Sequence, residues 1–397
     1  MLGDHKLILD AHSEVYRELL PWADGEFWNL DQHRIIPGAV YVFCRESVNQ
    51  WAWLIRELAE SGIVRVVVDN AAEGSETLVT WCAIKGLADL VQQGRIVLIS
   101  GGDMGPRWKY LQYEYFLPKI LDFDENVVTA QHSHQIFDHK EKPYKFLFLN
   151  GRLRSHRKYL LERFALSGLL DQALWTNLDT DLLLVRNANS GRWYEDDAPD
   201  STSLIRLDYG VEDLMERPIS VHYLPAQYEA WPHRKQLGVE PTEHQRNTKS
   251  QLFNHTWGDA IVDAAAYRDT YFSLVTETVF NYPYSFRTEK IWKPIAVGHP
   301  FIAVANRGFY RDLHRLGFRT FGHVIDESFD TIDRSQDRIE RIATIVEDLC
   351  QQDLAGFLDQ CQDVCKYNQQ LYAETRHRVA RDFPDQFRKF IDTHFHE

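Results

Sequence analysis

The sequence predicts an α/β protein with two compact lobes. A chain of 397 residues is longer than one hydrophobic core usually supports, which favours two lobes. Two stretches, 64–100 and 145–166, place a short apolar run before an amphipathic segment, the pattern of a strand followed by a helix. Strands joined by helical crossovers run parallel. We therefore expect a parallel sheet in each lobe, with a cleft between the lobes as the default binding site.

The composition indicates a globular protein that does not bind nucleic acid. A formal net charge of -14 disfavours contact with phosphate polymers. The five cysteines lack the spacing of a disulfide framework or a zinc site. No apolar stretch reaches the roughly 18 residues of a transmembrane helix, and the N-terminus does not resemble a signal peptide. We expect a cytoplasmic protein without a transmembrane segment, whose association with the inner face of a membrane would be peripheral.

The first lobe, residues 1–143, is expected to alternate strands and helices. Its clearest unit runs from a strand at 64–69 through a helix at 77–91 to a strand at 96–100. An earlier strand at 40–43, with a helix at 50–61, extends the same order. This alternation makes the lobe Rossmann-like.

Polar side chains follow two strands of this lobe. Asp69, Asn70 and Glu73 come after one strand, and Ser100 to Asp103 end and follow the next. In open parallel sheets, ligands gather beyond the carboxyl ends of the strands. We therefore expect a functional edge at these residues.

The polar segment 122–143 is expected to connect the two lobes as a solvated linker. It contains three histidines, His132, His134 and His139. A metal site made by these imidazoles is the alternative.

The second lobe, residues 144–380, is expected to open with a buried strand at 145–150, a basic turn and a helix at 158–166. From Asp171 to about Pro218 the chain becomes acidic and irregular, which we interpret as an excursion. Asp179 and Asp181 have the Asp-x-Asp spacing of metal-dependent sites. The run before them, 174–178, contains Thr and Asn and is not typical of a buried strand. We therefore expect no essential metal.

Regular structure is expected again from a strand at 271–276 that ends in Glu277. Asp333, with Gln336 as its capping-box partner, indicates the start of a later amphipathic helix. A terminal helix in 381–397 is expected to pack on the first lobe. The elements predicted between these points are a helix at 289–297, a strand at 300–305, a helix at 309–316 and a strand at 320–324.

The turn Arg287-Thr-Glu-Lys290 has the residue types that hold a phosphate. Thr288 can cap the helix while its first-turn N–H groups stay exposed, and Arg287 and Lys290 bring cations to the same end. Glu289 can accept hydrogen bonds from sugar hydroxyls. The alternative is a capped surface helix with solvated cations.

A second basic cluster follows the strand at 145–150. The order of strand, basic turn and helix is typical of phosphate binding, and parallel strands place this turn at the same edge as the turn at 287–290. A pyrophosphate between the two turns is our hypothesis. The alternative is a basic turn that only offsets the acidic residues nearby. The residues of the cluster are Asn150, Arg152, Arg154, His156 and Arg157.

Over these residues the chain resembles the GT-B glycosyltransferases, and most of all the donor-binding lobe of the alpha-1,3-fucosyltransferases. That lobe has a Glu upstream of an aromatic-x-Thr-Glu-Lys turn, then a helix and a strand led by Pro. The stretch 317–330 is also similar to glycosyltransferase-like proteins of bacteria and phages. The likeness covers roughly 145–350 and is absent from the first lobe. The matching positions are Glu277, Phe286, Thr288, Glu289, Lys290 and Pro300.

The resemblance implies a GT-B-like fold and a metal-independent glycosyltransferase that moves a hexosyl or deoxyhexosyl group from a nucleotide-sugar to a glycan or lipid-linked saccharide. Bacterial surface polysaccharide synthesis is the implied setting. Glu289 and Lys290 would contact the ribose and phosphates, with Glu277 near the sugar. No cofactor beyond the nucleotide-sugar substrate is expected.

An inverting transfer needs a group that removes the proton of the acceptor hydroxyl. We expect this base in the first lobe, where Asp103, Glu73 and Asp69 are the candidates. The nucleotide, the sugar and the stereochemical outcome stay open.

Two other functions remain as alternatives. His299-Pro300 resembles the His-Pro pair of transferases that use CMP-sugars of the Kdo or sialic acid type, although we favour a packing role for the pair, with the proline opening a strand. The second alternative is a noncatalytic subunit that binds a nucleotide-sugar. A dinucleotide-dependent epimerase is disfavoured because no strand is followed by G-x-G-x-x-G.

Overall fold

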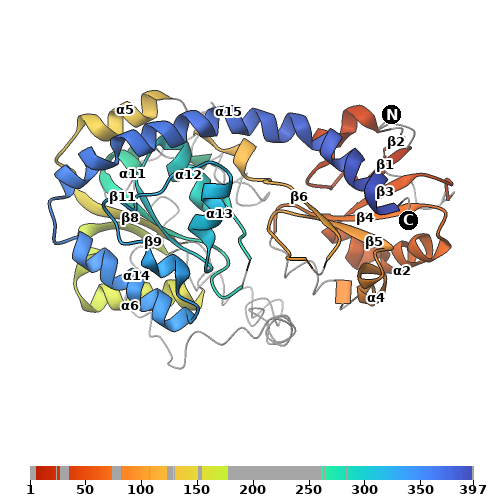
Figure 1. Ribbon diagram of the computed structural model, residues 1–397, viewed down its shortest axis with the longest axis horizontal. Helices are drawn as coiled ribbons and strands as arrows, with labels where there is room; N and C mark the ends of the chain where they lie inside the picture. Colours follow the sequence, from red (N-terminus) through yellow and green to blue (C-terminus); the bar gives the residue numbers. More distant parts are fainter. Residues whose placement is uncertain are drawn as a thin grey trace, which may run out of the picture. The chain divides into compact units, whose positions relative to one another are not determined.

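The computed structural model shows an α/β protein of two compact units (Figure 1). Unit 1 comprises Met1–Pro118 and Thr375–Glu397, and unit 2 comprises Lys119–Glu374. Each unit is built on a parallel sheet. No helix in the described part of the chain combines the length and the apolar character needed to cross a membrane. The structure describes residues 6–23, 25–26, 35–73, 82–83, 85–106, 108–122, 128, 130–150, 154–177, 261–262, 264–282 and 284–395.

Unit 1 is built on a six-stranded sheet in the order β2-β1-β3-β4-β5-β6. Its central strands are buried along almost their whole length, as expected of a parallel sheet covered on both faces. These strands are β3 (Val40–Cys44), β4 (Arg65–Asn70) and β5 (Ile96–Ser100). The other elements are β1 (Leu7–Leu9), α1 (Tyr16–Leu19), η1 (Leu20–Trp22), β2 (Gly25–Glu26) and β6 (Tyr110–Gln112).

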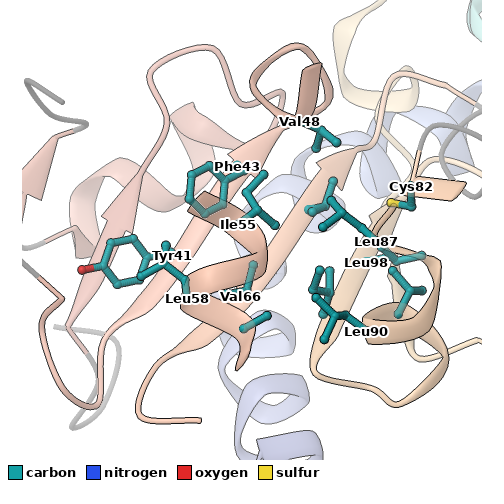
Figure 2. Close-up of a cluster of buried hydrophobic side chains, with 14 of the residues drawn as sticks. Tyr41, Phe43, Val48, Ile55, Leu58, Val66, Cys82, Leu87, Leu90 and Leu98 are labelled. Atoms are coloured by element: carbon teal, nitrogen blue, oxygen red, sulfur yellow. The ribbon is translucent and has the colours of Figure 1, made fainter. Parts of the chain in front are cut away.

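The helices α2 (Arg45–Ser61) and α4 (Ala88–Gln92) pack on one face of this sheet. Figure 2 shows Phe43 and Leu98 from the strands directed at Ile55 and Leu90 from the helices. Burial of this apolar surface, at roughly 25 cal/mol per Å², is the main force that holds the helices on the sheet. It also fixes the loops at the carboxyl ends of β3, β4 and β5.

Unit 2 is built on a four-stranded parallel sheet in the order β12-β11-β8-β9. The strands are β8 (Tyr144–Asn150), β9 (Ala173–Asn177), β11 (Thr270–Thr276) and β12 (Phe301–Val304). A small second sheet pairs β7 (Leu121–Asp122) with β10 (Ile261–Val262).

Helices cover both faces of the unit 2 sheet (Figure 1). On one side α6 (Ser155–Leu166) packs on α14 (Ser335–Leu349); on the other, α5 (Ala130–Asp138), α11 (Ala264–Arg268) and α12 (Glu289–Val297) pack together. The remaining elements are η3 (Leu117–Lys119), η4 (Leu169–Gln172), α13 (Phe309–Arg315), η7 (Ser328–Thr331) and α15 (Leu354–Phe395).

The two central strands of the unit 2 sheet, β8 and β11, are parallel neighbours whose following connections run toward opposite ends of the strand order. β8 continues through α6 to β9, whereas β11 continues through α12 to β12 on the other side. In open parallel sheets, ligands bind beyond the carboxyl ends of the strands at such a switch point. Both α6 and α12 therefore begin at the carboxyl edge of the sheet, where this topology favours a ligand.

The long helix α15 contributes to both units. Its residues up to Glu374 belong to unit 2, and those from Thr375 belong to unit 1. Within unit 1, the rings of Phe383 and Tyr113 have centroids 4.4 Å apart, and Arg376 donates to the carbonyl of Pro118 at 2.9 Å.

Several predicted elements are confirmed. α12 and β5 have the predicted bounds, and β4, β8, β11, β12 and α13 differ from prediction by one or two residues. Each has a strong local signal, an apolar run that ends at Pro, Gly or a polar cap. The last turn of the helix predicted at 77–91 is α4, and residues 74–81 lie outside the described chain.

Two strand predictions are wrong. The run judged untypical of a buried strand contains β9, in which Leu174 and Trp175 are buried and the polar Thr176 and Asn177 fall at the carboxyl end. Residues 320–324, predicted as a strand, form turns instead. The carboxylate of Glu327 accepts from the N–H of Phe321 at 2.7 Å, which satisfies locally a group that a strand would pair with a neighbour. Asp179 and Asp181 lie outside the described residues.

Two further expectations are corrected. Asp333 does not cap α14, because its side chain is paired with Arg307 and the helix starts two residues later. The segment 122–143 includes α5, whose buried face contains Ile136 and Phe137, and so is not only a solvated linker. His134 and His139 are exposed.

Candidate anion-binding site

The candidate site lies at the carboxyl edge of the unit 2 sheet, where the connections after β8 and β11 meet. Glu277, the residue after β11, is fully buried. Its carboxylate accepts from the hydroxyl of Thr288 at 2.7 Å, from the N–H of Thr288 at 3.2 Å and from the N–H of Thr278 at 3.3 Å. Burial raises the pKa of Glu277, and the charge of Lys290 acts in the opposite direction. The carboxylate thus ties the end of β11 to the start of α12.

Thr288 is the N-cap of α12. Its backbone is extended, and its side-chain oxygen accepts from the N–H of Lys290 at 3.2 Å, which confirms the predicted cap. The N–H of Lys290, expected to stay exposed, is instead the group that the cap binds. Because the same hydroxyl donates to Glu277, both its proton and a lone pair are used. The first turn of α12 is therefore oriented by a buried carboxylate, and the positive end of the helix macrodipole lies at the edge of the sheet.

The ammonium of Lys290 lies directly over this helix terminus. It is 3.2 Å from the hydroxyl oxygen of Thr288 and 3.4 Å from that of Thr278, and it forms an ion pair with Glu289. Burial alone would raise the pKa of Glu289, but Lys290 and Lys293 outweigh it and lower the pKa. Glu289 is therefore a charged acceptor at the same terminus.

The α6 side of the edge contributes buried cationic and polar groups. Asn150, at the end of β8, accepts from the hydroxyl of Thr276 at 2.9 Å. His156 Nε2 lies 3.0 Å from the carbonyl oxygen of Glu277, and Arg157 donates to the carbonyl of Thr276 at 2.9 Å. His156 and Arg157, predicted as donor-binding cations, thus hold the backbone at the end of β11.

The protonation state of His156 follows from this geometry. Burial, followed by the charge of Arg157, lowers the pKa of His156 well below its usual value. A neutral imidazole beside a carbonyl oxygen must carry its proton on Nε2. His156 is therefore a neutral donor and not a cation.

Arg154 and Arg287 complete the predicted set. Arg154 is the N-cap residue of α6 and is half-buried; Arg287 is buried just before Thr288. Arg152 lies outside the described residues. The structure thus brings Asn150, Arg154, His156, Arg157, Glu277 and residues 287–290 to one edge of one sheet.

This arrangement suits an anion that also carries hydroxyl groups. Helix N-termini attract negative charge through their dipole and their N–H groups without intrahelical partners. Lys290, Arg154 and Arg287 place fixed positive charge at the same edge. Glu289 adds an acceptor for hydroxyls. Phosphate and sugar are the chemical groups that match these donors and acceptors.

The three candidate bases lie in unit 1, in different environments. Asp69 is fully buried and accepts from Ser13 Oγ at 2.5 Å, from the N–H of Val15 at 3.1 Å and from the N–H of Ala71 at 3.0 Å. Burial raises the pKa of Asp69. Its carboxylate organises the loop after β1.

Asp103 and Glu73 are more accessible. Asp103 is half-buried, accepts from the N–H of Gly105 at 2.8 Å and is hydrogen-bonded to the hydroxyl of Tyr110. The side chain of Glu73 is 43% exposed and lies 3.5 Å from Arg45. Glu73 is thus the most open of the three carboxylates.

His299 and the stretch 317–330 have structural roles. His299 accepts from Ser273 Oγ at 2.9 Å and donates to the carbonyl of Thr270 at 2.9 Å, and burial lowers its pKa to about 3. Asp330 accepts from the N–H of Tyr310 at 3.0 Å at the start of α13. Both ring nitrogens of His299 are used within the sheet, which favours the packing interpretation of His299-Pro300.

Sequence reasoning missed two residues, Thr278 in the site and Arg338 beside it. Thr278 supplies an N–H to Glu277 and a hydroxyl oxygen near Lys290. Arg338 of α14 donates to the carbonyl of Phe280 at 2.7 Å, inside the connection between β11 and α12. A signal for Arg338 was present, because it lies four residues before Ile342 on the apolar face of α14, where an arginine needs a specific partner.

No group of three or more His, Cys, Asp or Glu side chains is arranged to hold a metal within the described ranges. Comparison of the chain with protein-family models, with curated proteins and with solved structures found no match. Fold and site together define an α/β protein with a main parallel sheet in each unit and a candidate anion site at the carboxyl edge of the four-stranded sheet of unit 2. Its ligand has to be inferred from its own residues.

Proposed function

We propose that this protein is a glycosyltransferase with a GT-B-like fold that binds a nucleotide-sugar at the edge of the unit 2 sheet and transfers the sugar to a glycan. The observation that carries the proposal is the clamp of Glu277 on Thr288, which aims the N-terminus of α12 and Lys290 at the switch point between β8 and β11. This is the place where doubly wound sheets hold nucleotides.

The phosphates of the nucleotide would lie against the first turn of α12. Lys290 is the cation best placed for them, since its ammonium already lies over the N-cap. A phosphate there would compete with Glu289 for this ammonium and leave the Glu289 carboxylate for ribose or sugar hydroxyls. Charge-assisted hydrogen bonds of this kind contribute about 1.5–3 kcal/mol each. In this proposal the cations of the protein replace a metal.

A thermal-shift screen tests the proposal. The intact protein is heated with GDP, UDP, CMP, CDP and dTDP and their common sugars, with and without EDTA. A ligand of the native state raises the midpoint of unfolding. We expect one nucleotide family to do so, with its sugar form at least as effective, and we expect EDTA to have no effect.

Two lysine variants locate the site. Lys290→Ala should weaken the binding of that nucleotide by about 10- to 100-fold, as expected for loss of one charge-assisted contact. Lys366→Ala removes an exposed lysine of α15 and should bind like the wild type. If no nucleotide stabilises the protein, or if both variants bind equally well, the donor site is not here.

Turnover separates an enzyme from a nucleotide-sugar-binding subunit. With the nucleotide-sugar chosen by the screen, release of the nucleoside diphosphate should depend on an added saccharide acceptor. Binding without acceptor-dependent release would favour the noncatalytic function.

A further inference from the structure

Arg338 is a buried guanidinium outside the candidate site. Its side chain is 2% exposed, and burial lowers its pKa to about 10. Within the ranges that the structure describes, no carboxylate forms an ion pair with it, and its Nε–H has no hydrogen-bond partner. It donates instead to the carbonyls of Phe280 and Ile332, at 2.7 and 2.8 Å, and at 3.3 Å to the carbonyl of Asp333 and the hydroxyl of Ser335. Burying an arginine without an ion pair is unfavourable, so a specific structural role is indicated.

The guanidinium also contacts an aromatic ring. The carbon of the guanidinium lies 4.4 Å from the centroid of Phe280. The imidazole of His156 stacks on the same phenyl ring, with centroids 5.2 Å apart and planes inclined by 15°. Phe280 therefore contacts both Arg338 of α14 and His156 of α6 through its ring.

The stack ends at the backbone of the site. His156 donates from Nε2 to the carbonyl of Glu277 at 3.0 Å, and Arg157 donates to the carbonyl of Thr276 at 2.9 Å. Arg338 holds the carbonyl of Phe280, three residues further along. The backbone on both sides of Thr278 is thus fixed from outside the loop, while the Glu277 carboxylate fixes Thr288 from inside it.

We propose that Arg338 is a positioning residue for the anion site. By holding Phe280 against His156, it sets the path of the chain after β11, and through Glu277 it sets the direction of the N-terminus of α12. Its forked shape matters, because two separate nitrogens donate to the carbonyls of Ile332 and Phe280 while the guanidinium carbon lies over the Phe280 ring, and a single ammonium lacks this geometry. This inference rests on the proposed function, since it assigns a residue to the same ligand site.

The test compares two substitutions with a matched control. Arg338→Met removes the charge and the donors, whereas Arg338→Lys keeps the charge and loses the planar fork. Arg341→Met alters another arginine of α14, one that pairs with Asp326. The readouts are amide hydrogen exchange of residues 277–288 without ligand, and binding of inorganic pyrophosphate and of the nucleotide chosen by the screen.

We expect Arg338→Met and Arg338→Lys to raise exchange in 277–288 and to weaken pyrophosphate binding by about tenfold, the usual size of a coupling through packed neighbours. Arg341→Met should leave both readouts unchanged. If Arg338→Lys, which keeps the positive charge, binds pyrophosphate as weakly as Arg338→Met, the loss comes from positioning and not from charge. If Arg338→Met does not fold, Phe280→Leu removes the stack while keeping the arginine and should give the same two changes.

Four results would overturn the inference. The first is unchanged exchange in 277–288 in the Arg338 variants, and the second is binding by Arg338→Lys equal to the wild type. If the wild type binds neither pyrophosphate nor any nucleotide, the proposed function fails and this inference fails with it. If the wild type binds and Arg338→Met binds as tightly, only this inference fails.

Discussion

One carboxylate holds both the hydroxyl and the backbone N–H of Thr288. Glu277, eleven residues earlier in the chain, accepts these hydrogen bonds at 2.7 and 3.2 Å. A strand end and a helix start are thereby joined inside the protein, where a hydrogen bond to a charged group is strong. The orientation of α12 follows from this contact, and the first two of four predictions concern it.

Glu277→Gln should destabilise the protein by about 1–3 kcal/mol, the usual cost of leaving a buried donor unsatisfied. The glutamine amide has one acceptor oxygen, and its NH₂ group would face N–H donors that now bond to the carboxylate. Urea unfolding of both proteins measures the difference. Equal stability combined with lost nucleotide binding would mean that Glu277 serves the ligand and not the clamp.

Thr288→Ala should cost about 1 kcal/mol of stability, because α12 loses its N-cap. Thr288→Ser keeps the hydroxyl and should restore most of the stability. We also expect the alanine variant to bind the nucleotide more weakly than the serine variant. Only serine keeps the hydroxyl that donates to Glu277 and accepts from the N–H of Lys290, and so keeps α12 in its orientation. Unfolding and binding measured on the two variants in parallel provide the comparison.

His299 should make the protein less stable as the pH falls below neutrality. Burial lowers its pKa in the folded protein from 6.5 to about 3, so between these values the unfolded chain binds a proton that the native state does not. At pH 5 this lowers the free energy of unfolding by about 2 kcal/mol relative to neutral pH.

His299→Gln should reduce this pH dependence, because glutamine does not titrate. His156 is also buried with a lowered pKa and acts with the same sign. It is present in both proteins and cancels in the comparison. Urea unfolding at pH 5 and pH 7.5 gives the result, and an equal pH dependence in the two proteins would contradict the assignment.

The three candidate bases should separate into two groups. Asp69→Asn should destabilise the protein by about 1–3 kcal/mol, because its carboxylate accepts three hydrogen bonds in the interior. Glu73→Gln should change stability by less than about 0.5 kcal/mol, as expected for an exposed side chain.

If Glu73 or Asp103 is the base, Glu73→Gln or Asp103→Asn should lower acceptor-dependent turnover by about 100-fold or more while nucleotide binding is unchanged. A stable, fully active Asp69→Asn variant would show that the buried hydrogen bonds of Asp69 are dispensable. Turnover with the nucleotide-sugar from the screen measures the first effect, and urea unfolding measures the second.

Local patterns in the sequence predicted much of the fold. The strand at 96–100 and the helix at 289–297 have their predicted bounds because their apolar runs end at strong local signals, such as the Gly298 that adopts a φ of 72° after α12. β9 was missed because its strand character depends on its parallel partner β8. The strand predicted at 320–324 failed because Glu327, a few residues on, satisfies the backbone locally.

The candidate site was predictable in its residues and not in their roles. The turn at 287–290 was found from residue types, Glu277 was implied by the resemblance to the fucosyltransferase donor lobe, and Thr288 is the N-cap that the sequence predicted. His156 and Arg157 were expected to bind the donor, but their hydrogen bonds to the carbonyls of residues 276 and 277 could be known only from the fold.

The sequence by itself determined the α/β class, most strands and helices, and the cap that begins α12. These features depend on apolar periodicity and on side chains that bond to their own neighbouring backbone. Only the tertiary structure decided that Glu277 accepts from Thr288, that Arg338 of α14 donates to Phe280, and that the ring nitrogens of His299 are hydrogen-bonded to β11. Those contacts join segments between 11 and 58 residues apart, and burial in a low-dielectric interior gives them their strength.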